Sequence, residues 1–194
     1  MGRLARPRLA IGLLAAAALA GCHHVNKTPA DAYQRFSEAV TARDGGALFD
    51  ALDQPTRWAW MTIQKYHREA YDIVLSNYPE GPDRDRESHR FEGGATATSA
   101  RELFRAEVAP GVLPMLAPLV AADAKVEDAS GDGHAAAVLA SGARVPLSRG
   151  EDGGWGFSGL AKDAEDLKTR AYHDLEVVRA SAADYERAAT RAGK

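Results

Sequence analysis

Four short runs of β-forming sequence between residues 125 and 158 constrain the fold of this 194-residue chain more than any other feature. They cover about residues 125–128, 134–140, 144–148 and 154–158, and the segments "SGDG", "SGA" and "GEDGG" separate them. Short breaks rich in glycine and aspartate are typical of the tight turns of β-hairpins. The pattern therefore predicts a four-stranded antiparallel meander with one buried face.

Alternation along these runs assigns their apolar side chains to faces of the sheet. The residues that share a face are Ala136, Val138 and Ala140 in the second run, Val145 and Leu147 in the third, and Trp155 and Phe157 in the fourth. We expect Trp155 and Phe157 to anchor the core rather than to belong to a cofactor site.

Helical spacing dominates the residues before the runs. Thr28-Pro29-Ala30-Asp31 combines an N-cap, a first-turn proline and an acid, which together predict a helix start, and Asp44-Gly45-Gly46 ends that helix. Further helices are predicted over residues 47–52, from Pro55 to about Tyr78, and after a capping box at Ser99.

Two segments between these helices are predicted differently. The charged segment "PEGPDRDRESHR", residues 79–90, predicts an exposed loop with intermixed ion pairs. Pro110-Gly111 is predicted to end the helix that begins near Ser99, and the apolar segment "VLPMLAPLV", residues 112–120, predicts a short helix under the sheet.

A long helix is predicted from about Asp163 to Arg191, because apolar residues recur there every three or four positions. We expect its first half to pack on the sheet. Its second half carries mostly alanine, so we expect it to project into solvent, with a partner-binding heptad as the alternative. The fold class is therefore α+β: N-terminal helices packed on a four-stranded antiparallel meander, followed by a long C-terminal helix.

The segment "AYQRFSEAVTARDGGALFDAL", residues 32–52, together with the helix-then-meander order, resembles NTF2-like domains over about residues 30–160. The resemblance implies that early helices cover a bent sheet and leave a pocket. The long C-terminal helix departs from the usual ending of that family, which is a strand. NTF2-like domains include enzymes, carriers and scaffolds, so the resemblance implies no single activity.

The N-terminus predicts export. Arg3, Arg6 and Arg8 precede an uncharged run from Leu9 to Ala20, which is too short to span a bilayer and has the layout of a secretory signal. Leu19-Ala20-Gly21-Cys22 then resembles the lipobox of bacterial lipoproteins. The resemblance implies cleavage between Gly21 and Cys22 and attachment of a diacylglyceryl group to the Cys22 thiol.

Three parts follow from this interpretation: a signal peptide over residues 1–21, a lipidated tether over residues 22–28, and a single α+β domain over residues 29–194. Two or more acyl chains anchor a protein stably to a membrane surface. In the lipoprotein family the residue after the cysteine influences sorting, and His23 favours the outer membrane, facing the periplasm. Cys22 is the only cysteine of the chain, so lipidation would leave no thiol for disulfide chemistry.

The charge of the chain argues against nucleic acid as a partner. Its formal net charge is −3, and loss of the three arginines of the signal would make it −6. Affinity for nucleic acid depends largely on cationic contacts with phosphate. The expected contacts are therefore with the membrane, through the acyl chains, and with an envelope protein or a small apolar ligand.

Motifs that impose a reaction are missing from the sequence: it contains no GxSxG, HExxH, Walker or dinucleotide-binding pattern. We therefore predict no catalytic, metal-binding or cofactor-binding residues. Our first hypothesis is a non-enzymatic binding domain with a pocket between the third helix and the sheet; the alternative is an NTF2-like isomerase or hydrolase that uses His67 or an acid. The candidate pocket residues are Trp58, Trp60, Tyr66, His67 and Trp155.

Overall fold

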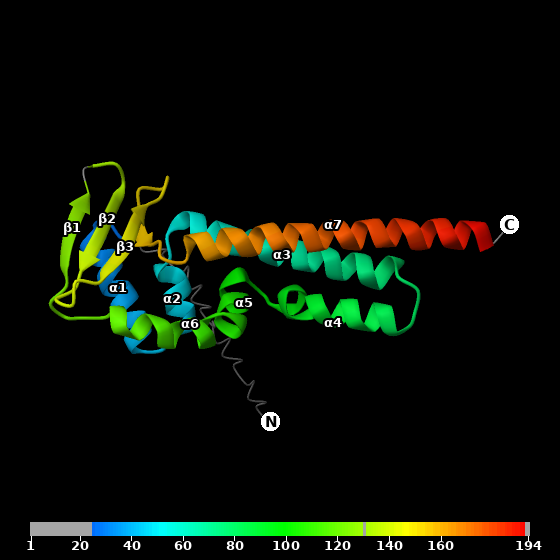
Figure 1. Ribbon diagram of the computed structural model, residues 1–194, viewed down its shortest axis with the longest axis horizontal. Helices are drawn as coiled ribbons and strands as arrows, with labels where there is room; N and C mark the ends of the chain where they lie inside the picture. Colours follow the sequence, from blue (N-terminus) through cyan, green and yellow to red (C-terminus); the bar gives the residue numbers. More distant parts are fainter. Residues whose placement is uncertain (1–24, 130, 193–194) are drawn as a thin grey trace, which may run out of the picture.

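The computed structural model describes residues 25–129 and 131–192, which form seven α-helices, one short 3₁₀ helix and four strands (Figure 1). In chain order these are α1 (Pro29–Thr41), α2 (Gly45–Ala51), α3 (Gln54–Asn77), α4 (Pro82–Thr96), α5 (Ala100–Glu107), α6 (Ala109–Leu116), η1 (Ala117–Leu119), β1 (Lys125–Ala129), β2 (His134–Val138), β3 (Arg144–Arg149), β4 (Trp155–Phe157) and α7 (Ala161–Ala192). The predicted signal peptide and Cys22 lie outside the described residues. None of the helices in the described part is both long and apolar enough to cross a bilayer.

The four strands form one sheet in the order β1-β2-β3-β4, with every neighbouring pair antiparallel, so the predicted meander is confirmed. Ala135 lies opposite Leu147, which lies opposite Phe157, and all three belong to the core. The face of β2 that carries Ala136 and Val138 is therefore not the one that packs on this core. Residues 135–137 are all alanine, so the sequence offers no size contrast that identifies the buried face.

Helix α1 covers the buried face of the sheet and contacts all four strands. Thr28 caps it as predicted: the Asp31 N–H donates to Thr28 Oγ1 at 3.1 Å, and the Asp31 carboxylate accepts from the Thr28 N–H. The ring of Phe36 lies 4.3 Å from that of Phe157, centroid to centroid, and both side chains are almost fully buried. Phe157 is thus a core anchor, as expected.

Helices α3 and α7 run side by side in the same direction and extend away from the sheet, and α4 returns along α3 (Figure 1). A second core cluster holds these three helices together. Its members on α7 are Leu175, Val178 and Ala182. The second half of α7 therefore packs against α3 and α4, and the expected projection into solvent is limited to the exposed residues 186–192. In its first half, Ala164 and Ala171 belong to the core cluster that includes the sheet residues, although α3 is the main neighbour of α7. We call this three-helix extension the arm.

Helix α4 replaces most of the loop predicted over residues 79–90. Pro82 begins the helix, and Asp83 in its first turn pairs with Arg86 at 2.9 Å. Phe91 is 1% exposed and fixes the helix to the second cluster. The prediction failed because only Phe91 and Gly94 of this helix are buried, which is too few for a visible apolar period.

The apolar segment near residue 112 forms α6, which begins at Ala109, so Pro110-Gly111 lies inside a helix rather than ending one. Helix α6 packs mainly on α5 and α2, not under the sheet as predicted. A close approach makes this packing feasible: a Cβ on Gly45 would lie 2.4 Å from the Cβ of Ala109. Glycine at position 45 therefore lets the start of α2 rest directly on α6.

Candidate functional site

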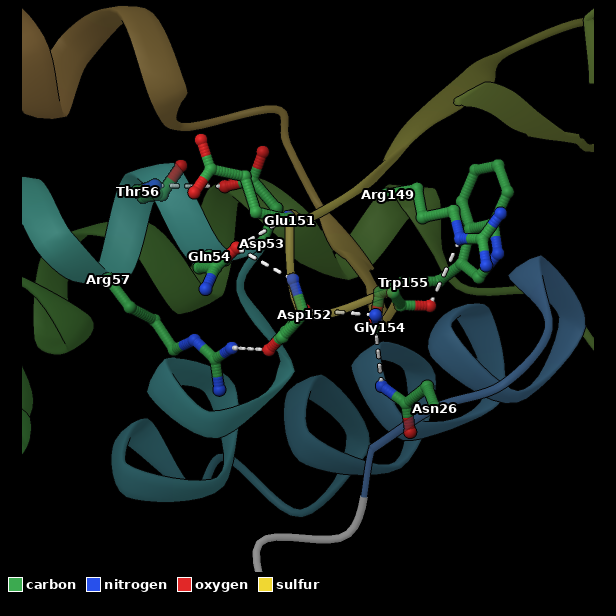
Figure 2. Close-up of polar contacts among 11 residues, drawn as sticks. Asn26, Asp53, Gln54, Thr56, Arg57, Arg149, Glu151, Asp152, Gly154 and Trp155 are labelled. Atoms are coloured by element: carbon green, nitrogen blue, oxygen red, sulfur yellow. Dashed lines mark hydrogen bonds and ion pairs between the residues drawn. The ribbon is translucent and has the colours of Figure 1, made fainter. Parts of the chain in front are cut away.

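A buried carboxylate joins the start of α3 to two strands. Asp53 is 3% exposed and precedes α3, where its Oδ1 accepts a hydrogen bond from the Thr56 N–H at 3.1 Å (Figure 2). Its Oδ2 accepts from the Ser148 hydroxyl of β3 at 2.5 Å, and its own N–H donates to the Phe157 carbonyl of β4 at 3.0 Å. One residue thus fixes the register of a helix against two strands.

The turn between β3 and β4 is held against the same end of α3. Gln54 Oε1 accepts from the Glu151 N–H at 2.6 Å, and Arg57 forms an ion pair with Asp152 at 3.8 Å (Figure 2). Gly156 of β4 lies against the chain at this point, because a Cβ there would lie 2.5 Å from backbone atoms of Asp53. Larger residues at position 156 would separate the strand from the helix start.

We call the contact region between the start of α3, β3 and β4 the junction. Asn26, near the start of the described residues, adds two hydrogen bonds to it. Asn26 Nδ2 donates to the Trp155 carbonyl at 3.0 Å, and the Trp155 N–H donates to the Asn26 carbonyl at 2.9 Å (Figure 2). Asn26 is 6% exposed, although we expected it in a solvated tether. These two bonds cover the outer edge of β4, which would otherwise present unpaired backbone groups. The folded part of the chain therefore includes Asn26.

A small pocket of about 70 Å³ lies at the junction, among Asn26, Gln54, Arg57, Asp152 and Trp155. Sites for drug-sized ligands usually enclose about 300–1,000 Å³. The pocket is therefore too small for the apolar ligand that we predicted between α3 and the sheet. Its wall contains both a carboxylate and a guanidinium, which suits a small polar group rather than an apolar one.

The geometry of Asp53 and Ser148 does not make a nucleophile. A serine attacks only when a base takes its proton, and that base is usually a histidine that a third group orients. Asp53 accepts the Ser148 hydroxyl on one oxygen and a backbone N–H of α3 on the other. No histidine lines the 70 Å³ pocket within the described ranges. The pair therefore serves to link the start of α3 to β3.

The predicted pocket residues lie in separate surroundings. Trp58 is 48% exposed on α3, whereas Trp60 is 4% exposed and packs edge to face on Phe104 of α5 at 5.4 Å. The ring of Tyr66 packs at a tilt on that of Tyr172 of α7, 5.7 Å between centroids. Trp155 of β4, the fourth aromatic candidate, belongs to the junction described above. These four side chains do not line a common pocket in the described structure.

His67 faces α4 rather than the sheet. Its ring packs edge to face on Phe91 at 5.8 Å, and a Cβ on Gly94 would lie 2.4 Å from His67 Nδ1. Burial lowers the pKa of His67; the charge of Asp174 opposes this shift and that of Arg90 adds to it. Asp174 forms an ion pair with Arg90 at 2.5 Å, so its charge is already compensated. The described contacts of His67 include no hydrogen bond to a carboxylate.

Sequence reasoning did not identify Asp53, Ser148 or Asn26 as positions that hold the fold together. A signal existed for Asp53, because Asp followed by proline at the second helical position is a common helix start. Ser148 and Asn26 carry no comparable local signal, since their partners lie 95 and 129 residues away.

Comparison with known proteins adds no functional assignment. No protein-family model matches the chain, and neither a curated protein nor a solved structure is significantly similar to it. Across residues 25–129 and 131–192, no three histidine, cysteine, aspartate or glutamate side chains are grouped as metal ligands would be. Function must therefore be inferred from the geometry of the domain.

Proposed function

We propose that the protein is a lipoprotein of a bacterial envelope, anchored through acyl chains on Cys22, whose domain binds a partner protein along the arm without catalysing a reaction. The outer membrane, with the domain facing the periplasm, is the proposed location. The observation that carries the partner-binding part is the arm itself: a three-helix extension that leaves large apolar side chains exposed.

The position of Asn26 supports the anchoring part. Asn26 is bonded to β4 and lies four residues after Cys22, a separation of at most about 14 Å in an extended chain. Acyl chains on Cys22 would therefore hold the junction, rather than the tip of the arm, next to the bilayer. A docking surface on the arm would then remain accessible to a partner.

Exposed apolar residues on the arm support the proposal that a partner protein binds there. Val177 of α7 is 61% exposed, Tyr172 is 46% exposed, and Leu75 of α3 is 40% exposed. The partner-binding heptad, our alternative for the second half of α7, is not available, because Val178 and Ala182 are buried in the cluster formed with α3 and α4. The partner surface is therefore the outer side of α7, which carries Val177.

The enzyme hypothesis has weaker support. It requires His67 and a carboxylate to face one cavity, and the His67 ring packs on Phe91 of α4 instead. If His67→Ala kept the fold and abolished turnover of a ligand, the enzyme hypothesis would replace the binding hypothesis.

Site-specific photocrosslinking tests the partner-binding part. A photoreactive amino acid replaces Val177 in the host cell, and a matched control replaces Arg144, an exposed residue of β3. We expect one protein-sized adduct with the Val177 probe and none with the control, and Val177→Lys should weaken recovery of that partner. Equal adducts at both positions, or none at position 177, would refute a partner on the arm.

Lipidation has a separate test. Labelled palmitate should enter the wild-type protein but not Cys22→Ser, since only a thiol can form the thioether. Equal labelling of both proteins would contradict the anchoring part and leave the crosslinking result unaffected. Native mass spectrometry of Cys22→Ser with envelope extract should show a protein-sized adduct, and its absence would contradict the partner-binding part.

A further inference from the structure

A second, larger cleft lies away from the junction, between the α1–α2 turn and the α5–α6 helices. It encloses about 570 Å³, which is within the range of small-molecule sites. Its lining includes Arg43 and Arg105 as well as the apolar residues Pro110, Leu113 and Pro114 of α6. The cleft therefore combines cationic groups with an uncharged surface.

The apolar side continues beyond the cleft. Residues 109–122 contain no charged side chain, although most of α6 and η1 lies at the surface. Met115 of α6 is 72% exposed, the highest value among the large apolar side chains reported as exposed. Uncharged surface of this kind marks contact with an apolar group rather than a typical solvent-facing helix.

Arg43 occupies a backbone position that normally belongs to glycine. Its φ is 53°, the only left-handed value for a non-glycine residue in the described part of the chain. The Arg43 N–H donates to the Val40 carbonyl and the Asp44 N–H to that of Ala39, which is the Schellman end of α1. An L side chain there costs about 1–2 kcal/mol relative to glycine. Among the described residues the Arg43 guanidinium has no hydrogen-bond or ion-pair partner, so no such contact offsets this strain.

The charges around the cleft leave a positive excess. Arg105 has one distant ion-pair partner, Glu102 at 3.9 Å. Asp44 also lines the cleft, but its Oδ1 accepts from the Gly46 and Ala47 N–H groups of α2. Hydrogen bonding from the Ala47 N–H lowers the pKa of Asp44, and the charge of Arg105 adds to this shift, so Asp44 partly compensates Arg105. The lining of the cleft still holds two guanidinium groups and one carboxylate.

We propose that this cleft binds a free single-chain amphiphile with an anionic head group, carboxylate or phosphate, held by Arg43 and Arg105, with its apolar chain against Pro110, Leu113 and Pro114. Charge complementarity selects the head group, since guanidinium binds both oxyanions well. The inference goes beyond the proposed partner on the arm and does not depend on lipidation of Cys22.

Calorimetric titration of the full chain carrying Cys22→Ser, below the critical micelle concentration, tests the proposal. The probes are dodecanoate and dodecyl phosphate, with dodecyltrimethylammonium as the chain-matched cation. We expect the two anions to bind and the cation to bind at least about tenfold more weakly, the effect of one charge-assisted contact. Equal binding of the cation, or no binding of either anion, would overturn the proposal.

Substitutions separate binding from folding. Arg43→Gly should weaken dodecanoate binding about tenfold while raising the Tm by about 2–8 °C, because glycine relieves about 1–2 kcal/mol of left-handed strain. Arg43→Lys should keep most of the affinity, and Lys65→Gln, an exposed site on α3, should change nothing. Undiminished binding by Arg43→Gly would refute the role of Arg43. Co-sedimentation with phosphatidylglycerol vesicles that Arg43→Gly abolishes, without binding of free dodecanoate, would replace the free amphiphile with a membrane surface.

Discussion

The Asp53–Ser148 pair gives the sharpest test of how the sheet and α3 are joined. Replacing Asp53 by alanine removes the N-cap of α3 and the acceptor of the Ser148 hydroxyl. Ser148 is only 8% exposed, so water cannot easily replace that acceptor. Loss of an N-cap costs about 0.5–2 kcal/mol. Loss of a hydrogen bond to a charged group costs about 1.5–3 kcal/mol. We therefore expect Asp53→Ala to lower the free energy of unfolding by about 2–5 kcal/mol.

Ser148→Ala should cost less, about 1.5–3 kcal/mol, because it removes the shared hydrogen bond but leaves the cap in place. The double variant should be no less stable than Asp53→Ala alone, since the serine hydroxyl has already lost its acceptor there. Urea denaturation followed by far-UV circular dichroism, with Cys22→Ser as the common background, measures all four free energies.

The coupling energy from this double-mutant cycle decides the interpretation. A shared bond predicts a coupling of at least about 1 kcal/mol. If the two losses add to within about 0.5 kcal/mol, the residues act independently and Asp53 is only a helix cap. Ser88→Ala, at an exposed hydroxyl of α4 that bonds only within its own helix, is a control that should change stability little.

Three further predictions follow from individual contacts. Burial lowers the pKa of His67 below the 6.5 of the unfolded chain, so its contribution to stability should be complete above about pH 6.5 and fall as the pH drops. In urea titrations, the free energy of unfolding should therefore decrease less between pH 7.5 and pH 5 for His67→Gln than for wild type. Gly156→Ala should destabilise by about 1–3 kcal/mol through overpacking, whereas Gly111→Ala, with open space around it, should stabilise by about 0.4–1 kcal/mol in the same assay. Asn26→Ala should speed hydrogen exchange of the Trp155 amide, and unchanged exchange would show that the side-chain bond does not hold the edge of β4.

The sheet was predictable from sequence because its information is local. Each turn is specified by a few glycine, serine and aspartate residues, and a meander pairs strands that are neighbours in the chain. The start of α1 was predictable for the same reason, since Thr28 and Asp31 exchange their hydrogen bonds across three residues. The α+β class and the length of α7 followed from these local signals.

The prediction of α4 failed for a physical reason. Its stability comes from first-turn acids, from ion pairs three residues apart, and from the burial of Phe91 against α3 and α7. A single buried apolar residue gives no period, and two glycines near its end argue against a helix. Only the neighbouring helices supply the missing stabilisation.

The candidate sites show the same division. The sequence by itself determined the turns, the starts of α1 and α5, the apolar stripe of α7 and the expectation of an anchor at Cys22. The tertiary structure decided that Asp53 meets Ser148 across 95 residues and that Asn26 meets Trp155 across 129. It also decided that the predicted pocket residues separate: Trp58 and Trp60 lie on opposite sides of α3, and His67 lies on the side of Trp60 but two turns further along, where it packs on Phe91 of α4. Local hydrogen bonds and turns are encoded within a few residues, whereas contacts between distant segments depend on how every element packs.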